Sequence, residues 1–98
     1  PKVINFQSEA EVERACERLK QVTSICSFKI LNFILQSGET YVKDISDACL
    51  IKQKAVSHHL LRLKRRKLVK SRRDGKNVHY SCVNPDAIKT ILETALKL

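Results

Sequence analysis

The sequence contains no methionine or tryptophan, and only two glycines, two prolines and five aromatic residues among 98. So few aromatic residues predict an interior of Leu, Ile and Val, and they leave no stacking platform for single-stranded RNA. No apolar run approaches the roughly 18 residues of a membrane span, and the N-terminus lacks the apolar segment of a signal peptide. We therefore expect a cytoplasmic protein with no membrane partner. The start at Pro1 fits either a removed initiator Met or an unseen leader.

The length and the missing catalytic patterns argue against an enzyme. A chain of 98 residues has room for one small domain, which we expect to span 1–98. It has no glycine-rich phosphate loop, no paired carboxylates in a cleft pattern and no metal-ligand spacing. Cysteine and histidine are the only side chains here that we consider as candidates for nucleophilic catalysis. We therefore expect a binding protein.

Positive charge is concentrated in one stretch of the chain. The net charge is +9, yet residues 1–51 carry a net −1 and residues 77–98 carry none. Residues 52–76 hold eleven cations and one acid, a net +10. This concentration indicates a surface that binds a polyanion. The alternative is a solvated charged face, but the run coincides with a predicted helix and hairpin rather than with a loose tail.

Apolar residues recur at helical spacing through the first part of the chain. Ser8 and Glu11 form a capping box that begins a helix over 8–22. Its apolar stripe consists of Val12, Ala15, Cys16 and Leu19. A second helix over 24–37 is capped by its first serine and is apolar nearly all round, so we expect it to be the buried helix. Gly38 ends it, at a position that favours a left-handed residue.

Residues 41–67 show the pattern helix, short turn, helix. Val42, Ile45 and Cys49 mark a short third helix, residues 50–52 a turn, and residues 53–67 a fourth helix. At about 100° per residue, one side of the fourth helix is apolar and the opposite side is mainly cationic. The apolar side carries Val56, Leu60 and Leu63, and the opposite side carries Lys54, His58, Leu61 and Arg65. We expect the first side in the core and the second facing a partner.

Residues 68–83 predict a hairpin with a basic tip. Residues 68–73 are extended, Asp74-Gly75 is a turn signal, and residues 78–83 alternate at period two. Asn84-Pro85 then begins a last helix over 85–98 with an apolar stripe of Ile88, Ile91, Leu92 and Ala95. The predicted fold is mainly α with a two-stranded β-hairpin, in the order α-α-α-α-β-β-α.

One string of residues resembles a known family. Ala55-Val56-Ser57-His58-His59-Leu60, followed by Leu63, Leu68-Val69, Arg72-Arg73, Gly75 and Val78-x-Tyr80, resembles the arsenic-repressor (ArsR/SmtB) winged helix-turn-helix transcription factors. The resemblance covers roughly residues 12–98. It implies a homodimeric bacterial or archaeal repressor that binds a double-stranded DNA operator. It also implies that segments 1–22 and 85–98 form the dimer interface, 41–67 the helix-turn-helix and 68–83 the wing.

The chemistry of the basic stretch predicts which residues contact DNA. A recognition helix contacts bases near its N-terminus, and Gln pairs well with adenine, Lys with guanine, and Ser or His with several acceptors. The candidates are Gln53, Lys54, Ser57 and His58. Arg62 and Arg65 lie further along and are expected on phosphates. The wing tip, with Arg72, Arg73, Lys76 and Asn77, is expected against a minor groove, where it positions the protein rather than specifying sequence.

Several neighbouring residues have a structural interpretation. His59 lies at the border of the apolar face and is expected to pack or hydrogen-bond inside the protein, whereas His79 is expected in solvent. Leu61 is left unassigned: it meets a thymine methyl or sugar, or the helix is rotated slightly from the predicted orientation. For Lys64, Arg66 and Lys67, the sequence leaves open whether the side chain is exposed to solvent or contacts a phosphate.

The metal sites known in this family are missing from this sequence. The third-helix thiolate site has the form Leu-Cys-Val-Cys-Asp-Leu, whereas the corresponding residues here are Thr40-Tyr41-Val42-Lys43-Asp44-Ile45. The last-helix site requires histidine, and residues 85–98 contain none. Lys43, where a thiolate would lie, further disfavours a cation. We therefore expect no metal and no cofactor.

Four cysteines remain, and none forms a Cys-x-Cys or Cys-x-x-Cys motif. They are Cys16, Cys26, Cys49 and Cys82. The leading interpretation is that they are buried, reduced thiols that act as small apolar residues. Cys26 is the best candidate for a thiol sensor, because the N-terminus of the second helix would lower its pKa. In the sensor hypothesis, two of these thiols pair with each other, or they bind a thiol-reactive effector such as As(III), and either change alters the dimer and releases DNA.

Two further classes compete with a sequence-specific repressor. One is a winged-helix protein without a sensor. The other is a generic binder of nucleic acid or of an anionic membrane surface, which would bind unrelated polyanions with similar affinity.

Overall fold

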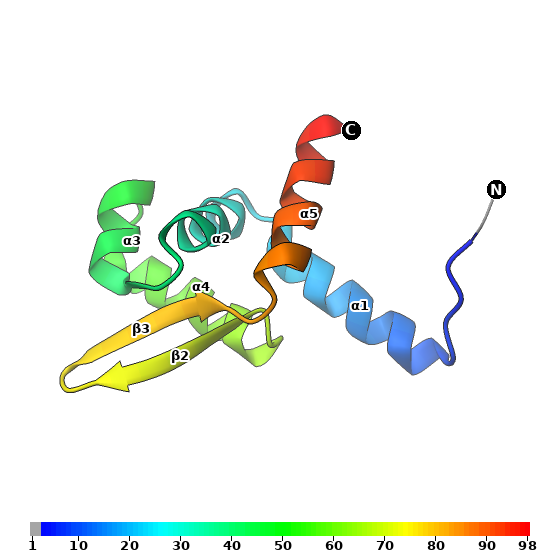
Figure 1. Cartoon of the computed structure of the whole chain (residues 1–98), viewed down its shortest axis with the longest axis horizontal. Coiled ribbons are helices and arrows are strands. Elements are labelled where there is room, and N and C mark those ends of the chain that lie inside the picture. The colour runs from blue at the N-terminus through cyan, green and yellow to red at the C-terminus, as the bar shows by residue number, and fades with distance from the viewer. Residues whose placement is uncertain (1–2) are drawn as a thin grey trace.

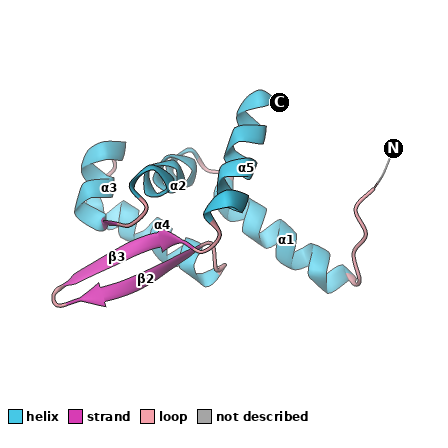
Figure 2. Cartoon of the chain, viewed as in Figure 1, coloured by secondary structure: helices cyan, strands magenta, loops and turns pink. Residues whose placement is uncertain are grey.

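The computed structural model describes residues 3–98, which form five helices and a small sheet whose β2–β3 hairpin projects from one edge of the molecule (Figure 1). In chain order the elements are α1 (Glu9–Val22), α2 (Ile25–Ser37), β1 (Thr40–Tyr41), α3 (Val42–Cys49), α4 (Gln53–Arg65), β2 (Val69–Asp74), β3 (Asn77–Cys82) and α5 (Pro85–Lys97). The mainly helical fold with a β-wing that the sequence predicts is confirmed (Figure 2). Residues 1–2 of the expected interface segment 1–22 lie outside the described residues.

Short polar side chains begin three of the helices. The Ser8 hydroxyl accepts a hydrogen bond from the backbone N–H of Glu11, and Ser24 caps α2 in the same way. The Asn84 side chain caps α5, directly before its first residue, Pro85. Each cap satisfies an N–H group that the helix itself leaves free. Gly38, at φ 78°, ends α2 as predicted, because a residue without Cβ adopts this conformation without strain.

The core is aliphatic and is centred on α2 and α4. Ile30, Leu31 and Ile34 of α2 are completely buried. The remaining core residues come from the end of α1, α3, α4, the base of the wing and α5: Val22, Ile45, Cys49, Val56, Leu60, Leu63, Leu68, Val69, Cys82, Ile88 and Leu92. The prediction that α2 is buried nearly all round is wrong at Ile25, which is 79% exposed. Ile25 lies in the first turn of α2, beside an open groove between α1 and α5.

The strands form one antiparallel sheet in the order β1-β3-β2. Thr40 pairs with Tyr80, and β2 pairs with β3 from Val69–Cys82 to Asp74–Asn77. The predicted two-stranded wing is thus extended by β1. A strand of two residues is too short to show a period in the sequence, and it exists here only because β3 supplies its hydrogen-bond partners.

Two boundaries differ from the prediction. Helix α4 ends at Arg65 rather than at residue 67, because Lys67 adopts a left-handed conformation (φ 60°) that directs Leu68 into the core. The hairpin turn is formed by Gly75 and Lys76, one residue later than Asp74-Gly75, and Gly75 has φ 62°. Gly at this position fits a tight hairpin turn that requires positive φ.

The molecule is elongated, with principal extents of 48 × 27 × 20 Å. The wing points toward one end and α1 extends toward the other (Figure 1). None of the helices within residues 3–98 combines the length and apolar character needed to cross a membrane.

Candidate nucleic-acid interface

Helix α4 has one buried side and one exposed side, oriented as its sequence predicts. Val56, Leu60 and Leu63 have no exposed surface, and they attach the helix to the core. Leu61 is 51% exposed, which places it on the outer side and confirms the predicted rotation of the helix. The other outer residues are also exposed: Gln53, Lys54, Ser57, His58, Arg62 and Arg65. All the predicted contacts on this helix therefore lie on one accessible surface.

A shallow hollow of about 410 Å³ lies over the first half of α4. It is lined by Lys52, Lys54, Ala55, His58, His59 and Arg62. The preceding turn passes through Leu50 in a left-handed conformation (φ 57°), and Lys52 provides no side-chain cap. The helix thus begins without a side-chain cap and with Lys52 and Lys54 at its first turn, which is an arrangement suited to a phosphate.

His59 lies on the inner edge of the same helix. Its Nδ1 is 3.4 Å from Oγ of the buried Ser27, which confirms the predicted hydrogen-bonding role inside the protein. Burial lowers the pKa of His59 below its ordinary value of 6.5, and the charges of Arg62 and His58 lower it further. His59 therefore favours the neutral form and joins α4 to α2.

The two faces of the wing carry different cations. Lys64 of α4 donates a hydrogen bond from Nζ to Oγ of Ser71, at 2.7 Å, so Ser71 faces α4. Successive strand residues point to opposite faces, so Arg73 lies on the same face as Ser71. Arg72 lies on the other face, with His79 opposite it on β3. The two adjacent arginines, which the sequence treats as equivalent, thus point to opposite sides.

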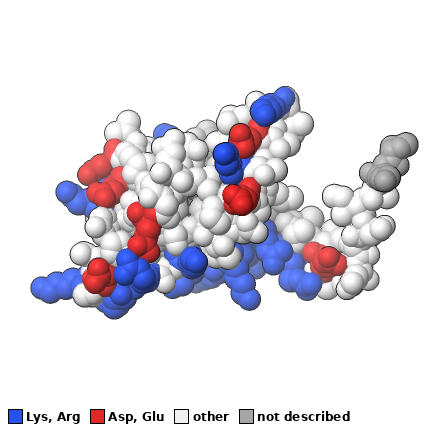
Figure 3. Space-filling view, in the orientation of Figure 1, with Lys and Arg blue, Asp and Glu red and all other residues white. Residues whose placement is uncertain are grey.

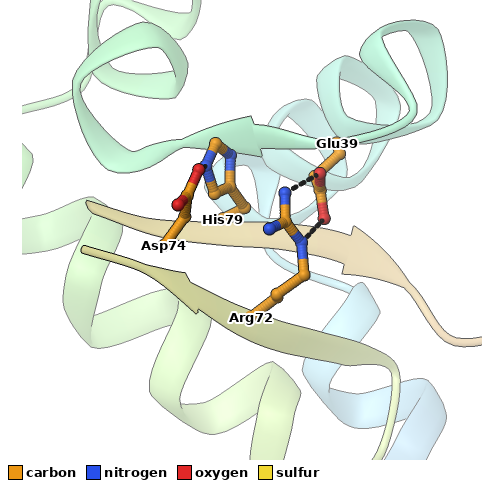
Figure 4. Close-up of polar contacts among 4 residues, drawn as sticks. All are labelled: Glu39, Arg72, Asp74 and His79. Atoms are coloured by element: carbon orange, nitrogen blue, oxygen red, sulfur yellow. Dashed lines mark hydrogen bonds and ion pairs between the residues drawn. The ribbon is translucent and has the colours of Figure 1, made fainter. Parts of the chain in front are cut away.

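Arg72 is already bound to a carboxylate of its own chain. Its Nη2 and Nε donate to the two carboxylate oxygens of Glu39, at 2.7 and 3.1 Å (Figure 4). This hydrogen bond with the arginine lowers the pKa of Glu39 and raises the pKa of Arg72. The wing cations Arg73 and Lys76 are exposed and, among the described residues, have no carboxylate within salt-bridge distance.

The expectation that His79 is in solvent is wrong. Its side chain is only 13% exposed, because the ring lies against Tyr41 with the ring centroids 4.5 Å apart. Its Nε2 also lies 3.8 Å from a carboxylate oxygen of Asp74. The reason is β1: its pairing with β3 brings Tyr41 directly opposite His79. A two-stranded hairpin would have left that face open.

The cations gather on one side of the molecule. Lys and Arg atoms form a nearly continuous band along the edge formed by the hairpin and the helix behind it (Figure 3). Two of the three cations for which the sequence allows either solvent exposure or a phosphate contact have partners within the chain. Lys64 binds Ser71, and Arg66 forms an ion pair with Glu17 of α1 at 3.2 Å. Lys67 is exposed.

A second, apolar surface lies between α1, the start of α2, and α5. It includes a groove of about 480 Å³ whose lining is mainly apolar. Leu19, Ile25 and Leu96 are 49%, 79% and 76% exposed along it. The predicted apolar stripes of the first and last helices are therefore only partly covered within one chain. Soluble monomers rarely leave such a continuous apolar patch uncovered.

The four cysteines are free and differ in exposure. Cys49 and Cys82 are buried as predicted, and burial raises the pKa of both thiols, that of Cys82 to about 11. Cys16 is exposed, which contradicts its assignment as a buried thiol, because α1 extends away from the body of the protein. Cys26 is partly exposed at the start of α2. Within residues 3–98, no three side chains among His, Cys, Asp and Glu approach closely enough to hold a metal ion.

The sequence patterns do not predict which residues contact the side chains of the wing. Glu39 and Arg72 are 33 residues apart, and Tyr41 meets His79 only through the sheet. No local period links such residues. The only available signal is that Glu39 directly follows the glycine that ends α2, in a turn that returns the chain toward the wing.

Comparison with known proteins agrees with this architecture. Residues 28–71 match the family model described as bacterial regulatory protein, arsR family. This segment is similar to the ArsR family of bacterial regulators. The matched segment runs from α2 through the outward-facing α4 to the start of the wing.

Solved structures of transcriptional regulators extend the likeness over nearly the whole chain. The AntR antimony-specific transcriptional repressor is 28% identical with a TM-score of 0.82, covering 97% of this chain and 85% of that one. The transcriptional repressor PagR of Bacillus anthracis is 25% identical with a TM-score of 0.77, covering 90% and 99%. A homodimeric winged helix-turn-helix DNA-binding domain from Mycobacterium bovis is 24% identical with a TM-score of 0.79, covering 95% and 88%, and shows the shared fold.

Proposed function

We propose that this chain is a transcriptional repressor of the ArsR type that binds a palindromic DNA operator as a homodimer. The observation that carries the proposal is the two-sided helix α4, whose buried Val56, Leu60 and Leu63 hold an exposed cationic side on the same edge as the wing. A helix of this kind fits the major groove, and a cationic hairpin beside it fits the adjacent backbone or minor groove. Such a protein acts by binding in the cytoplasm, without catalysis.

Segments 41–67 and 68–83 are assigned to DNA. Base contacts are proposed for the N-terminal half of α4, where Gln, Lys, Ser and His side chains are exposed, and phosphate contacts for the cations beyond it. The proposed contacts are Gln53, Lys54, Ser57, His58, Arg62, Arg65, Arg73, Lys76 and Asn77. Arg72 differs from them because its guanidinium is bound to Glu39.

Segments 1–22 and 85–98 are assigned to the dimer. The exposed Leu19, Ile25 and Leu96 provide an apolar patch that a second copy would cover. A related domain from Mycobacterium bovis is described as homodimeric. Two recognition helices in such a dimer would lie about 34 Å apart and contact half-sites one helical turn apart.

The central test is selection of bound duplexes from random DNA. We expect an imperfect palindrome preferred over unrelated DNA by about 10³ or more. If about four cations per subunit meet phosphates, the dimer neutralises about eight, and the log–log salt slope is near −7. Similar affinity for unrelated duplexes and anionic vesicles would instead support the generic polyanion binder, and a footprint without dyad symmetry would contradict the dimer.

Thiol control of DNA binding is a finer part of the proposal. Cys16 lies in the proposed dimer segment and is exposed, and Cys26 is partly exposed in the first turn of α2, next to the groove residue Ile25 in the sequence. Thiol oxidation or a thiophilic ion at this position would alter the packing between copies. The duplex selection repeated with reduced and peroxide-treated protein tests this: a change in affinity supports it, and equal affinity identifies a repressor without a thiol sensor.

A further inference from the structure

The ion pair between Glu39 and Arg72 connects two parts of the fold. Glu39 lies between Gly38, which ends α2, and the start of β1, whereas Arg72 lies in the middle of the outer wing strand β2. Strand β3 separates β1 from β2 in the sheet. Both carboxylate oxygens are engaged, at 2.7 and 3.1 Å from the guanidinium nitrogens. A two-point contact between a planar guanidinium and a carboxylate restricts orientation as well as distance.

Further contacts hold the base of the wing. On the same face as the ion pair, the Tyr41 ring of β1 lies against His79 of β3. In Figure 4 the side chains of Glu39, His79, Arg72 and Asp74 point to one side of the sheet. On the opposite face, Lys64 of α4 donates to Ser71 of β2. The wing is therefore attached to the body from both faces.

We propose that Glu39 and Arg72 are positioning residues that hold the wing in the orientation used for DNA binding, and that Arg72 is not a phosphate ligand. This inference rests on the proposed DNA-binding function. It assigns the direct wing contact to Arg73, which lies on the α4 face, and to Lys76 in the turn. A wing already held in place loses less conformational freedom on binding, and this increases affinity without adding a contact.

The competing explanation is that DNA displaces Glu39 from Arg72. The ion pair is partly exposed, with side-chain exposures of 56% for Arg72 and 39% for Glu39, and pairs of this kind are weak. In that case Glu39 competes with phosphate, so Glu39→Gln tightens DNA binding while Arg72→Gln weakens it. The positioning role predicts that both substitutions weaken binding, although they change the net charge in opposite directions.

The test measures the affinity of the full chain for the duplex recovered by selection, at several salt concentrations. The variants are Glu39→Gln, Arg72→Gln, both together, and the exchange Glu39→Arg with Arg72→Glu, which keeps the net charge and the pair. Arg73→Gln is the matched control, because this arginine is adjacent in sequence but on the other face. Thermal unfolding establishes that each variant is folded.

We expect each single variant to weaken binding about twofold to fivefold with an unchanged salt slope. The double variant binds the duplex with at least the affinity of the weaker-binding single variant, and the exchange of the two residues restores the original affinity. Arg73→Gln instead reduces the salt slope, by about 0.9 for each subunit. The proposal is overturned if Glu39→Gln tightens or leaves binding unchanged, or if Arg72→Gln reduces the slope as Arg73→Gln does.

A measurement without DNA separates this proposal from the proposed function. Amide hydrogen exchange of residues 69–82 in the free protein is compared among the same variants. Faster exchange in Glu39→Gln and Arg72→Gln, but not in Arg73→Gln, supports the positioning role even if no duplex is bound. Equal exchange in all variants overturns it, whatever the DNA affinity.

Discussion

Ser27 and His59 link the central helix to the proposed recognition helix, with Ser27 Oγ and His59 Nδ1 3.4 Å apart. Ser27 is buried, and its hydroxyl lies on the inner edge of α4, beside the core residues of that helix. The contact holds α4 while the neighbouring His58 faces outward. Two adjacent histidines therefore have different roles, one inside the fold and one on the surface.

The burial of His59 predicts that the stability of the protein depends on pH. The pKa of His59 is lowered from 6.5, mainly by burial, so between the two pKa values the folded protein holds fewer protons than the unfolded chain. The free energy of unfolding therefore rises with pH through this window. As the pH falls below about 6.5, protonation of His59 in the unfolded chain favours unfolding, and the protein becomes less stable. Urea unfolding from pH 5 to 7.5 measures it. His59→Gln should flatten this part of the profile, and His58→Gln should not.

The ion pair between Glu39 and Arg72 predicts that the wing changes at low pH. The hydrogen bond with Arg72 lowers the pKa of Glu39 from 4.5, and the charges of Arg72, His79 and Lys70 act in the same direction. The ion pair is thus fully formed above about pH 4.5 and is lost as the pH falls through the lowered pKa. The Arg72 Nε–H resonance should titrate with a midpoint below 4.5. The same change in Glu39→Gln would show that another group is responsible.

The four thiols should react in order of their exposure. Alkylation of the native, reduced protein, diluted until it is monomeric, should modify Cys16 first and Cys26 next, because their side chains are accessible in a single chain. Cys49 and Cys82 should react only after unfolding, since burial protects them and raises the pKa of both. Mass spectrometry at short reaction times measures the order. Protection of Cys16 that is lost on dilution would further indicate that a second copy covers α1.

Leu19 and Leu61 are a matched pair for separating assembly from DNA binding. They are similarly exposed, at 49% and 51%, but they lie on the apolar surface and on the outer side of α4, respectively. Leu19→Glu should produce a folded monomer with weak operator binding, because a charge in an apolar interface is costly to bury. Leu61→Glu should remain a dimer and lose affinity for all duplexes through repulsion from phosphate. Light scattering and anisotropy measure the two effects.

Gln53 is predicted to contribute to sequence preference. It is exposed at the first position of α4, where recognition helices contact base edges. Gln53→Ala should cost about 1–3 kcal/mol on the selected duplex and much less on unrelated DNA, with little change in salt slope. Arg65→Ala, near the end of the same helix, is the control and should weaken all duplexes alike. An equal loss on both kinds of duplex for Gln53→Ala would exclude a base contact.

Much of this fold can be predicted from the sequence because the relevant signals are local. The spacing of Val56, Leu60 and Leu63 identifies the buried side of α4, and the outward cations follow from it. The polar caps at Ser8, Ser24 and Asn84 set where helices begin. Each signal lies within one or two helical turns, a distance over which backbone geometry alone determines which side chains share a face.

The tertiary structure alone decided which polar groups meet and which apolar residues stay uncovered. The sequence shows Arg72 and Arg73 as one basic pair, but the pleat of β2 and the packing of β1 give Arg72 a carboxylate partner and leave Arg73 without one among residues 3–98. Cys16 follows an apolar stripe, yet it is exposed because α1 extends from the body. A periodic pattern specifies a face, whereas what that face contacts depends on the placement of segments far apart in the chain.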